Sequence, residues 1–203
     1  MENEVLIADD HSMIRKGMKL YLQMNLGQKL VTEVSSCNEV MAELVKKKYT
    51  HLVLDILLTD GNSLEIIPNI RRVYPSLKIL IFSMQPAEVY AEALKQYDIH
   101  YYLSKSAGEQ EIIQVLTRFF SNTPADVLDP VFLKRLNPFS TLAPRELEVM
   151  HYILKGMGTK EISETLNLKM NTISTIKSRI FEKTNSTNIK ELFELASLYN
   201  ISY

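Results

Sequence analysis

The sequence has a single cysteine, Cys37, and no tryptophan. One cysteine excludes an intramolecular disulfide and suits a reducing compartment such as the cytosol. No apolar run approaches the roughly 18 residues that a membrane-spanning helix needs. The start of the chain, Met1-Glu2-Asn3-Glu4, is acidic, unlike the basic start of a secretion signal. We therefore expect a cytoplasmic protein that makes no membrane contact.

A strong charge of one sign is also missing. The formal net charge is −1, and 46% of the 203 residues are hydrophobic while 23% are charged. These values are ordinary for a globular protein, and they imply no chain-wide attraction to nucleic acid. Any contact with DNA must therefore depend on where the basic residues are placed. The length allows one domain or two small ones, each with its own core.

Short apolar runs alternate with helical patterns five times over residues 1–120. Apolar residues recur at helical spacing after each run, and Ser12 is available as the N-cap of the first helix. Five strands alternating with five helices predict right-handed crossovers and a doubly wound, five-stranded parallel sheet of the α/β class. The expected strands are residues 5–8, 30–34, 51–54, 78–82 and 99–103.

Polar side chains follow the ends of four of these strands. They are Asp9 and Asp10, Asp55, Ser83, and Lys105. The carboxyl ends of parallel strands form the ligand-binding edge of a sheet, although Asp55 taken alone could simply cap the polar turn that follows it. Clustered carboxylates repel one another, and a hard divalent cation such as Mg²⁺ relieves that repulsion. A lysine and a hydroxyl supply what a phosphoryl group needs, so the inferred chemistry is phosphoryl transfer to an aspartate.

Residues 1–120 resemble a response-regulator receiver domain. The opening segment, Asp9-Asp10-His11-Ser12-Met13-Ile14-Arg15-Lys16-Gly17-Met18, is similar to that of the NarL/FixJ branch of this family. The resemblance implies that Asp55 is the phospho-acceptor. It also implies a Mg²⁺ site in which Asp10 and Asp55 bind directly, Asp9 acts mainly through water, and the carbonyl of Leu57 completes the ligand set.

The same resemblance assigns the groups that respond to the phosphoryl group. It makes Ser83 the switch hydroxyl and Lys105 the cation that pairs with the phosphoryl oxygens. Tyr102, three residues before the lysine, takes the position of the family's rotating aromatic residue. The 22-residue interval from Ser83 to Lys105 agrees with the family spacing.

The sequence departs from the family pattern at four places. The segment 55–61 lacks the family's proline and is two residues shorter. Met84 follows the switch serine where a small residue is usual, and Tyr101 replaces a glycine. Ser106 follows the lysine in place of a proline. The shortened loop and Met84 motivate an alternative: a phosphorylation-independent DNA-binding regulator whose receiver serves as a protein-interaction or dimerisation module.

A second domain is expected at residues 139–203, after a linker at 121–138 that contains three prolines. Its pattern is wholly helical, with Thr159 as the expected cap of the second helix. Two short helices joined by a tight turn, the second one longer, form a helix-turn-helix. On that longer helix, isoleucines share the inner face and Lys177 lies at its flank. The outer arc carries Ser174, Thr175, Ser178, Arg179 and Glu182.

Residues 141–201 resemble the LuxR-type DNA-binding domain, whose opening is similar to Leu142-Ala143-Pro144-Arg145-Glu146-Leu147-Glu148-Val149. A helix with short polar groups fits the major groove, and lysines anchor phosphates. The resemblance places serine and threonine side chains in the groove, lysines near the DNA backbone, and the dimer surface on the final helix. The candidate DNA-binding residues are Lys160, Asn171, Ser174, Thr175, Lys177, Ser178 and Arg179.

The order of the two resemblances is that of the NarL/FixJ architecture. It implies a transcriptional regulator of a two-component phosphorelay, phosphorylated by a histidine kinase or phosphotransfer protein and bound to double-stranded promoter DNA as a homodimer. We do not expect an enzyme: a phosphohydrolase would need a second carboxylate as acid and base, and it would leave the helix-turn-helix unexplained. The four histidines show no mutual metal-site spacing and are expected to be structural.

Overall fold

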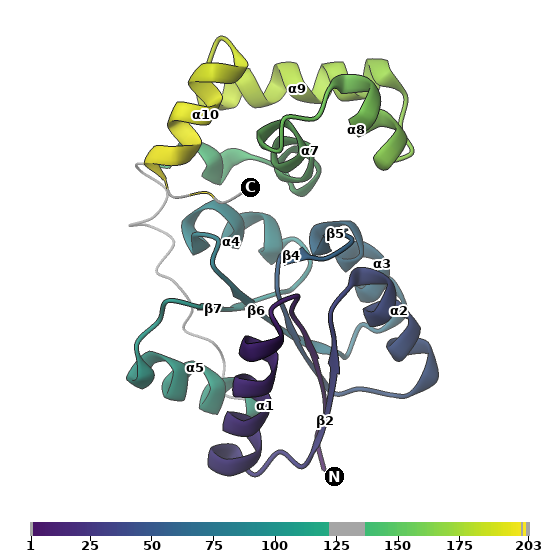
Figure 1. Cartoon of the computed structure of the whole chain (residues 1–203), viewed down its shortest axis with the longest axis vertical. Helices are drawn as coiled ribbons and strands as arrows, with labels where there is room; N and C mark the ends of the chain where they lie inside the picture. Colours follow the sequence, from purple (N-terminus) through teal and green to yellow (C-terminus); the bar gives the residue numbers. More distant parts are fainter. Residues whose placement is uncertain (1, 122–136, 200, 202–203) are drawn as a thin grey trace. The chain divides into compact units, whose positions relative to one another are not determined.

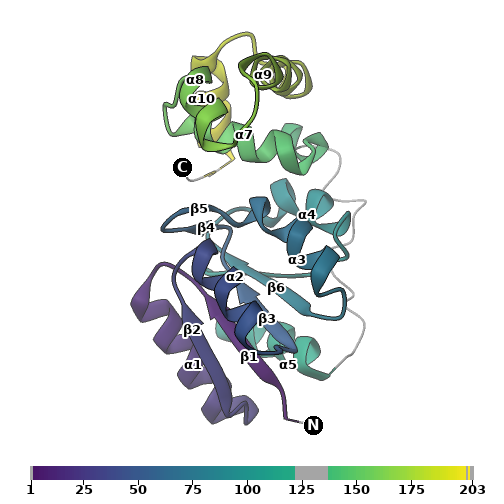
Figure 2. The same cartoon turned by 90° about the vertical axis from the view of Figure 1, so that its right-hand side faces the viewer.

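The computed structural model describes residues 2–121, 137–199 and 201, so residues 122–136 of the expected linker lie outside the described residues. The chain divides into two compact units (Figure 1, Figure 2). The first contains Met1–Met84 and Tyr97–Val127, and the second contains Gln85–Gln96 and Leu128–Tyr203. Among the described helices, none has both the length and the apolar character needed to cross a bilayer.

The first unit contains one five-stranded sheet in the order β2-β1-β3-β6-β7, and every neighbouring pair is parallel. This confirms the predicted doubly wound α/β sheet. The order reverses beside β1, and such a switch point opens a crevice at the carboxyl ends of the strands. The strands are β1 (Glu4–Ala8), β2 (Leu30–Val34), β3 (His51–Leu54), β6 (Lys78–Ser83) and β7 (Tyr101–Ser104).

Four helices belong to this unit: α1 (Ser12–Leu26), α2 (Cys37–Lys46), α3 (Ile67–Val73) and α5 (Glu109–Ser121). One face of the sheet packs against α1 and α5 in a core that includes Leu22 of α1 and Phe119 of α5, both fully buried. Alternate strand residues such as Leu6 and Leu52 are equally buried. Burial on both faces explains why the central strands β1, β3 and β6 are nearly continuous apolar runs.

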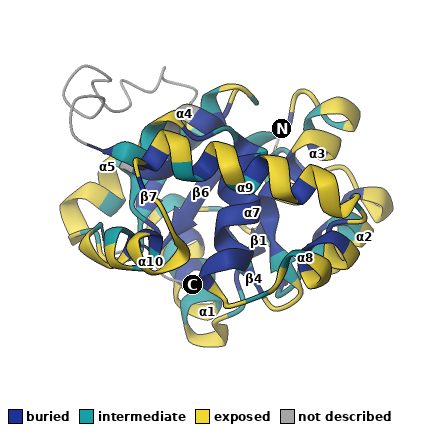
Figure 3. Ribbon diagram, turned by 90° about the horizontal axis from the view of Figure 1, so that it is seen from above, coloured by how far each residue is buried: buried dark blue, intermediate teal, exposed yellow. Residues whose placement is uncertain are grey.

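All regular elements described in the second unit are helices. Ile173, Ile176 and Ile180 are buried along one side of α9, and that helix packs against α7 and α8. Figure 3 shows the opposite side of α9 as a row of exposed residues. The elements are α4 (Ala87–Lys95), η2 (Pro138–Thr141), α7 (Pro144–Leu154), α8 (Thr159–Thr165), α9 (Met170–Thr184) and α10 (Ile189–Leu198).

Two predicted helix caps are wrong by one residue. Ser12 is the first residue of α1, and the N-cap is His11, whose own N–H donates to Asp9 Oδ1 at 2.8 Å. Thr159 is the first residue of α8, and the N-cap is Gly158. The N–H of Gly158 donates to Glu161 Oε2 at 2.6 Å, which is the half of a capping box that the third helical residue supplies. Glycine has no side chain to supply the other half.

Candidate functional site

Asp55 lies at the carboxyl end of β3 and is 4% exposed. Its Oδ1 accepts a hydrogen bond of 2.6 Å from Ser83 Oγ, at the end of β6. Its Oδ2 accepts one of 2.5 Å from Lys105 Nζ, just beyond β7. Three neighbouring strands thus deliver a carboxylate, a hydroxyl and an ammonium to one point. The site is nearly closed to solvent, where such interactions are stronger than in water.

Asp9, at the end of β1, lies on the other side of the lysine. It is 1% exposed, and its Oδ2 is 2.7 Å from Lys105 Nζ. Backbone pairing of Ala8 with Leu54 sets the two aspartates side by side on adjacent strands. One ammonium therefore bridges two buried carboxylates, which leaves this pair of aspartates with one uncompensated negative charge.

Asp10 is half-buried and completes an acidic cluster with Asp9 and Asp55. The side chain of His11 lies beside this cluster. His11 Nδ1 lies 2.5 Å from Asp10 Oδ1 and 3.5 Å from Asp9 Oδ1. Asp9, Asp10, His11 and Asp55 each offer one ligand atom within 4.8 Å of the others. His11, which was expected to be structural, thus lies among carboxylates, a neighbourhood that a comparison of the histidines with one another could not reveal.

Burial dominates the ionisation of the site. Burial raises the pKa of Asp55, and Asp9 adds to the rise, while Lys105 and Ser83 act in the opposite direction. Burial lowers the pKa of Lys105, but its interactions with Asp55 and Asp9 outweigh burial and leave that pKa raised. The ammonium thus stays charged, and it is the main group that keeps Asp55 available as a carboxylate.

The loop after Asp55 forms a small hairpin. β4 (Leu57–Leu58) pairs antiparallel with β5 (Gly61–Asn62), and Thr59 and Asp60 make the turn. The N–H of Leu57 points at Asp55 Oδ1 at 3.4 Å. The sequence analysis expected a polar turn here but no strands, because two-residue strands give no periodicity to detect. The loop after Asp55 is therefore an ordered part of the site, with Leu57 directly beside the acceptor.

Tyr102, the expected switch aromatic, and Met84, the residue after the switch serine, differ in how far they are buried. Tyr102 is half-buried on β7, in register with Ile81 of β6. Met84 is 57% exposed, directly after the buried Ser83. The structure therefore brings Asp9, Asp10, Asp55, Ser83 and Lys105 together, with Leu57 alongside and Tyr102 on the adjoining strand.

The second unit presents a separate polar surface on α9. Asn171, Ser174, Thr175, Ser178 and Arg179 are all exposed on this helix. Two of their hydroxyls donate back to the helix: Thr175 Oγ1 to Asn171 O at 2.9 Å, and Ser178 Oγ to Ser174 O at 3.1 Å. Their oxygens keep lone pairs that can accept, and the amide and guanidinium beside them can donate. The surface thus offers both hydrogen-bond donors and hydrogen-bond acceptors.

Basic groups flank this surface. Lys177 is half-buried, and its Nζ lies 5.8 Å from the centroid of the Phe181 ring. The aliphatic stem thus lies along the protein while the ammonium stays near the surface, as expected from its place at the flank of the helix. Lys160, at the start of α8, is exposed, and its Nζ is 4.0 Å from Glu164. The exposed pair of Lys160 with Glu164 is weak, so the Lys160 ammonium can bind another anion. The Lys177 ammonium, which lies near the surface, can do the same.

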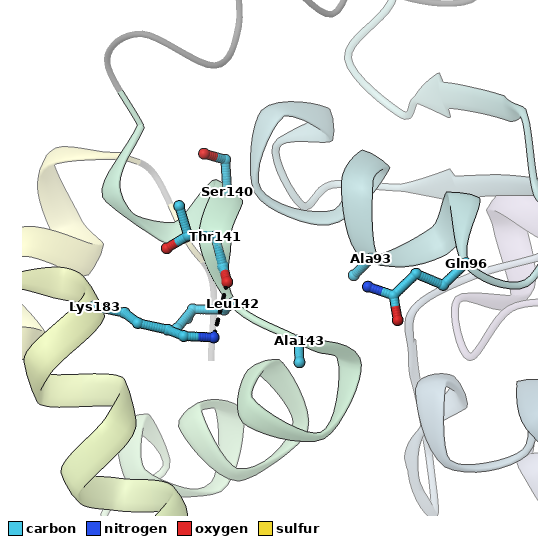
Figure 4. A pocket seen from close by; sticks show the side chains of 7 residues that line it. All are labelled: Ala93, Gln96, Ser140, Thr141, Leu142, Ala143 and Lys183. Atoms are coloured by element: carbon cyan, nitrogen blue, oxygen red, sulfur yellow. Dashed lines mark hydrogen bonds between the residues drawn. The ribbon is translucent and has the colours of Figure 1, made fainter.

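The second unit also contains a pocket beside η2. Lys183 Nζ is turned toward the backbone there, donating to Thr141 O at 3.1 Å and to Glu146 Oε2 at 2.6 Å. The ammonium is thus committed to stabilising the start of α7, and the other lining side chains are uncharged. The lining residues are Ala93, Gln96, Ser140, Thr141, Leu142, Ala143 and Lys183 (Figure 4).

Comparisons with known proteins agree with this geometry. The family model of the response regulator receiver domain matches residues 5–117, and that of the LuxR family of bacterial regulatory proteins matches residues 140–196. The response regulator UvrY of Escherichia coli is 30% identical over 202 residues, which cover 95% of this chain and 92% of UvrY. The oxygen regulatory protein NreC of Staphylococcus epidermidis is 30% identical over 95% of this chain and 96% of its own.

A solved structure shows the same fold. RcsB from Salmonella enterica serovar Typhimurium, bound to promoter rprA in the presence of phosphomimetic BeF3-, superposes with a TM-score of 0.84 at 23% identity. The similarity covers 97% of this chain and 99% of that one. At this level of identity, the likeness supports the architecture, and the functional argument must come from the side chains themselves.

Proposed function

This chain belongs to the response regulator receiver family and carries a LuxR-family domain after the receiver, and on that premise we propose a DNA-binding regulator that is switched by phosphorylation of Asp55. The observation that carries the proposal is the position of the buried Asp55 carboxylate between Ser83 Oγ and Lys105 Nζ, at 2.6 and 2.5 Å. A hydroxyl donor and a cation are thus already aimed at the place where phosphoryl oxygens would lie.

The proposed reaction is transfer of a phosphoryl group from a histidine kinase, a phosphotransfer protein or a small phosphodonor. A carboxylate oxygen of Asp55 forms a bond to phosphorus while the bond between phosphorus and the donor's leaving group breaks. Lys105 and Ser83 then exchange their contacts with the carboxylate for contacts with the phosphoryl oxygens. Slow hydrolysis of the acyl phosphate resets the receiver, so the protein acts as a regulator and not as a turnover enzyme.

The acidic cluster fits Mg²⁺. Asp9, Asp10 and Asp55 present hard oxygen ligands close together. The N–H of Leu57 lies 3.4 Å from Asp55 Oδ1, and the carbonyl of the same residue would complete the ligand set. Mg²⁺ typically uses one or two carboxylates together with waters and substrate phosphates. When bound, the ion would neutralise negative charge on the carboxylates and phosphoryl oxygens. Lys105 offsets only part of the aspartates' charge, so the donor set still favours a cation.

The proposed switch is a change of partner for Ser83. The Ser83 hydroxyl donates to Asp55 in the resting protein. It would donate to a phosphoryl oxygen once the carboxylate has become an acyl phosphate. In the family pattern Tyr102 follows that movement, and the surface around β7 changes with it. Such a switch works by shifting a population between two states that bind partners differently.

The proposed target is double-stranded promoter DNA, with α9 in the major groove. The serine and threonine side chains exposed on α9 read base edges, while Lys160, Lys177 and Arg179 contact phosphates. A homodimer would place two copies of α9 on two half-sites. RcsB, of similar architecture, has been solved bound to a promoter in the presence of a phosphomimetic, which supports this proposal. A cytoplasmic location follows from these partners.

The test is intact-mass analysis with Mg²⁺ and a small phosphodonor, wild type beside Asp55→Ala. We expect one phosphoryl adduct on the wild type and none on the variant. Asp60→Ala is unsuitable as a control because Asp60 lies in the same loop, so Asp98→Ala, whose carboxylate is exposed on a separate loop, serves instead. Retention of the adduct by Asp98→Ala assigns the modification to Asp55.

The same experiment decides between this function and the phosphorylation-independent alternative. A wild type that neither forms the adduct nor binds beryllofluoride would have an acidic cluster without a phosphoryl role. The receiver would then serve protein interaction or dimerisation, and DNA binding would be unchanged by a phosphodonor. Steady release of phosphate from a phosphate ester would instead favour the hydrolase.

A further inference from the structure

The hairpin that follows Asp55 is tied at its tip to the start of α2. Asp60 Oδ1 accepts the N–H of Cys37 at 2.6 Å, and Asp60 Oδ2 accepts the N–H of Asn38 at 3.0 Å. Beside it, Thr59 Oγ1 donates to Ser35 O at 3.1 Å. The two turn residues of the hairpin thus make at least three hydrogen bonds to a segment more than twenty residues away in the sequence.

These bonds complete the cap of α2. The first N–H groups of a helix have no partner inside the helix, and they favour a nearby negative charge. Ser36 Oγ accepts the N–H of Glu39 at 3.1 Å, as a local N-cap does. The two N–H groups before it, those of Cys37 and Asn38, are satisfied by Asp60. The shortened loop therefore supplies half of the cap of a helix that lies elsewhere in the chain.

The same hairpin is fixed at its base to the acceptor. Leu57 pairs with Asn62 across the hairpin, and its N–H lies 3.4 Å from Asp55 Oδ1. The N–H of Ser63 donates to Ile56 O at 2.8 Å, which closes the base. The bonds of Asp60 and Thr59 to the start of α2 fix the other end of the hairpin, so Leu57 is held between two anchored ends.

We propose that Asp60 is a positioning residue for the Asp55 site, because its carboxylate holds the shortened hairpin on α2 and thereby fixes Leu57 beside the acceptor. The inference rests on the proposed function of Asp55 and names a residue through which that site is built. Coupling between two sites is reciprocal. Occupation of the Asp55 site by Mg²⁺ and beryllofluoride therefore tightens the contact of Asp60 with the start of α2.

Cys37 provides a built-in reporter of this contact. Its N–H is one of the two groups that Asp60 holds, and it is the one cysteine of the chain. Burial, followed by the charges of Asp60 and Glu65, raises the pKa of the Cys37 thiol to about 12. The thiolate is the reactive form, so alkylation is slow while the hairpin is docked and faster when it is released.

The experiment compares the full-length wild type with Asp60→Ala and Asp60→Asn. Mg²⁺ affinity is measured by calorimetry, and alkylation of Cys37 by iodoacetamide is timed with and without Mg²⁺ and beryllofluoride. We expect Asp60→Ala to weaken Mg²⁺ binding by at least about fivefold, the lower end of usual site-to-site coupling. The same variant should be alkylated faster, and beryllofluoride should slow alkylation in the wild type alone. Asp60→Asn keeps one acceptor oxygen, so it should fall between the two.

Glu39→Gln is the matched control. The Glu39 carboxylate also holds the start of α2, accepting the N–H of Ser35 at 2.6 Å and its hydroxyl at 3.0 Å, but it is not part of the hairpin. Its variant should bind Mg²⁺ like the wild type. If Glu39→Gln weakens Mg²⁺ binding as much as Asp60→Ala does, the effect belongs to α2 in general and the inference is overturned.

The remaining outcomes separate this inference from the function beneath it. A wild type that binds Mg²⁺ and beryllofluoride, together with an Asp60→Ala variant that matches it in affinity and alkylation, overturns the positioning role alone. A wild type that binds neither overturns both, since there is then no site for Asp60 to position.

Discussion

Lys105 Nζ lies 2.5 Å from Asp55 Oδ2, and both side chains are almost fully removed from solvent. The same ammonium is 2.7 Å from Asp9 Oδ2. Separating charges from water is costly, and such a pair is retained only if each member compensates the other. Lys105 therefore has two tasks in the resting protein: it offsets the charge of the acidic cluster, and it holds Asp55 ionised.

Replacing Lys105 with methionine should destabilise the receiver by about 3–5 kcal/mol near neutral pH, because buried carboxylates lose their counter-charge. Burial and Asp9 already raise the pKa of Asp55, and loss of the lysine removes the main opposing effect. When a carboxyl has a higher pKa in the folded state than in the unfolded state, the folded protein becomes less stable as pH rises. The stability difference between the variant and the wild type should therefore shrink in acid. Urea unfolding at neutral and acidic pH measures both effects.

Mg²⁺ should restore part of this loss, since a cation bound at Asp9, Asp10 and Asp55 replaces the missing charge. Lys46→Met is the matched control: Lys46 pairs with Glu43 on the exposed side of α2. An exposed pair contributes little, so neither stability nor its response to Mg²⁺ should change. Equal losses in the two variants would contradict the compensating role of Lys105.

Ser83→Ala should slow formation of the phosphoryl adduct by roughly tenfold or more. The Ser83 hydroxyl donates to Asp55 in the resting state at 2.6 Å. During transfer it would donate to a phosphoryl oxygen that gains negative charge, and hydrogen bonds to charged groups contribute about 1.5–3 kcal/mol. The rate is followed by intact mass. Ser104 lies opposite Ser83 in the register of β6 and β7, but its hydroxyl pairs with that of Ser106 at 2.8 Å. Ser104→Ala should therefore react at the wild-type rate, and equal slowing would refute a specific role for Ser83.

Lys177→Ala and Arg179→Ala should each weaken binding to a duplex selected from random double-stranded DNA. If each side chain contacts a phosphate, each variant should reduce the slope of log affinity against log salt by about 1. Titrations by fluorescence anisotropy at several salt concentrations give the slopes. Lys46→Ala on α2 of the receiver removes the same charge from an exposed lysine that pairs with Glu43 at 2.6 Å, so its slope should equal that of the wild type. An unchanged slope in all three would exclude α9 as the DNA-contacting helix.

The sheet and its helices could be predicted because their signals are local. The central strands of the large sheet are apolar runs, and the helices that pack on it repeat their apolar residues with helical period. The end of each strand then fixed where polar residues would meet, which is why Asp9, Asp55, Ser83 and Lys105 could be grouped from the sequence. Parallel pairing with this strand order leaves them little choice.

The features that could not be predicted depend on contacts between distant residues, which leave no local pattern in the sequence. The hairpin at 57–62 has strands of two residues, and Asp60 bonds Cys37 and Asn38 from more than twenty residues away. His11 joins the acidic cluster because its side chain leaves the N-cap of α1 toward Asp10. Side-chain direction at a helix start cannot be deduced from spacing. In each case the missing information is geometry, not residue type.

His51 gives a pH-dependent prediction far from the acidic site. It is 4% exposed at the start of β3, its ring packs 5.0 Å from Phe119 and 4.8 Å from Phe120, and its Nδ1 pairs with Thr50 Oγ1 at 2.8 Å. Burial, helped by the charge of Lys78, lowers the pKa of His51 to about 4. In the unfolded chain the value is about 6.5. The unfolded state therefore takes up a proton first as pH falls.

Because the unfolded state binds more protons between these values, stability falls as pH drops from about 6.5 toward 4. Each unit contributes about 1.4 kcal/mol, so His51 should cost the wild type about 2 kcal/mol between pH 7 and pH 5. His51→Phe should lose less by that amount in urea unfolding. Burial lowers the pKa of His151 to about 4 as well, but both proteins contain it, so the difference isolates His51. A variant with the wild-type pH slope would show that the imidazole is already protonated, or solvated, in the folded receiver.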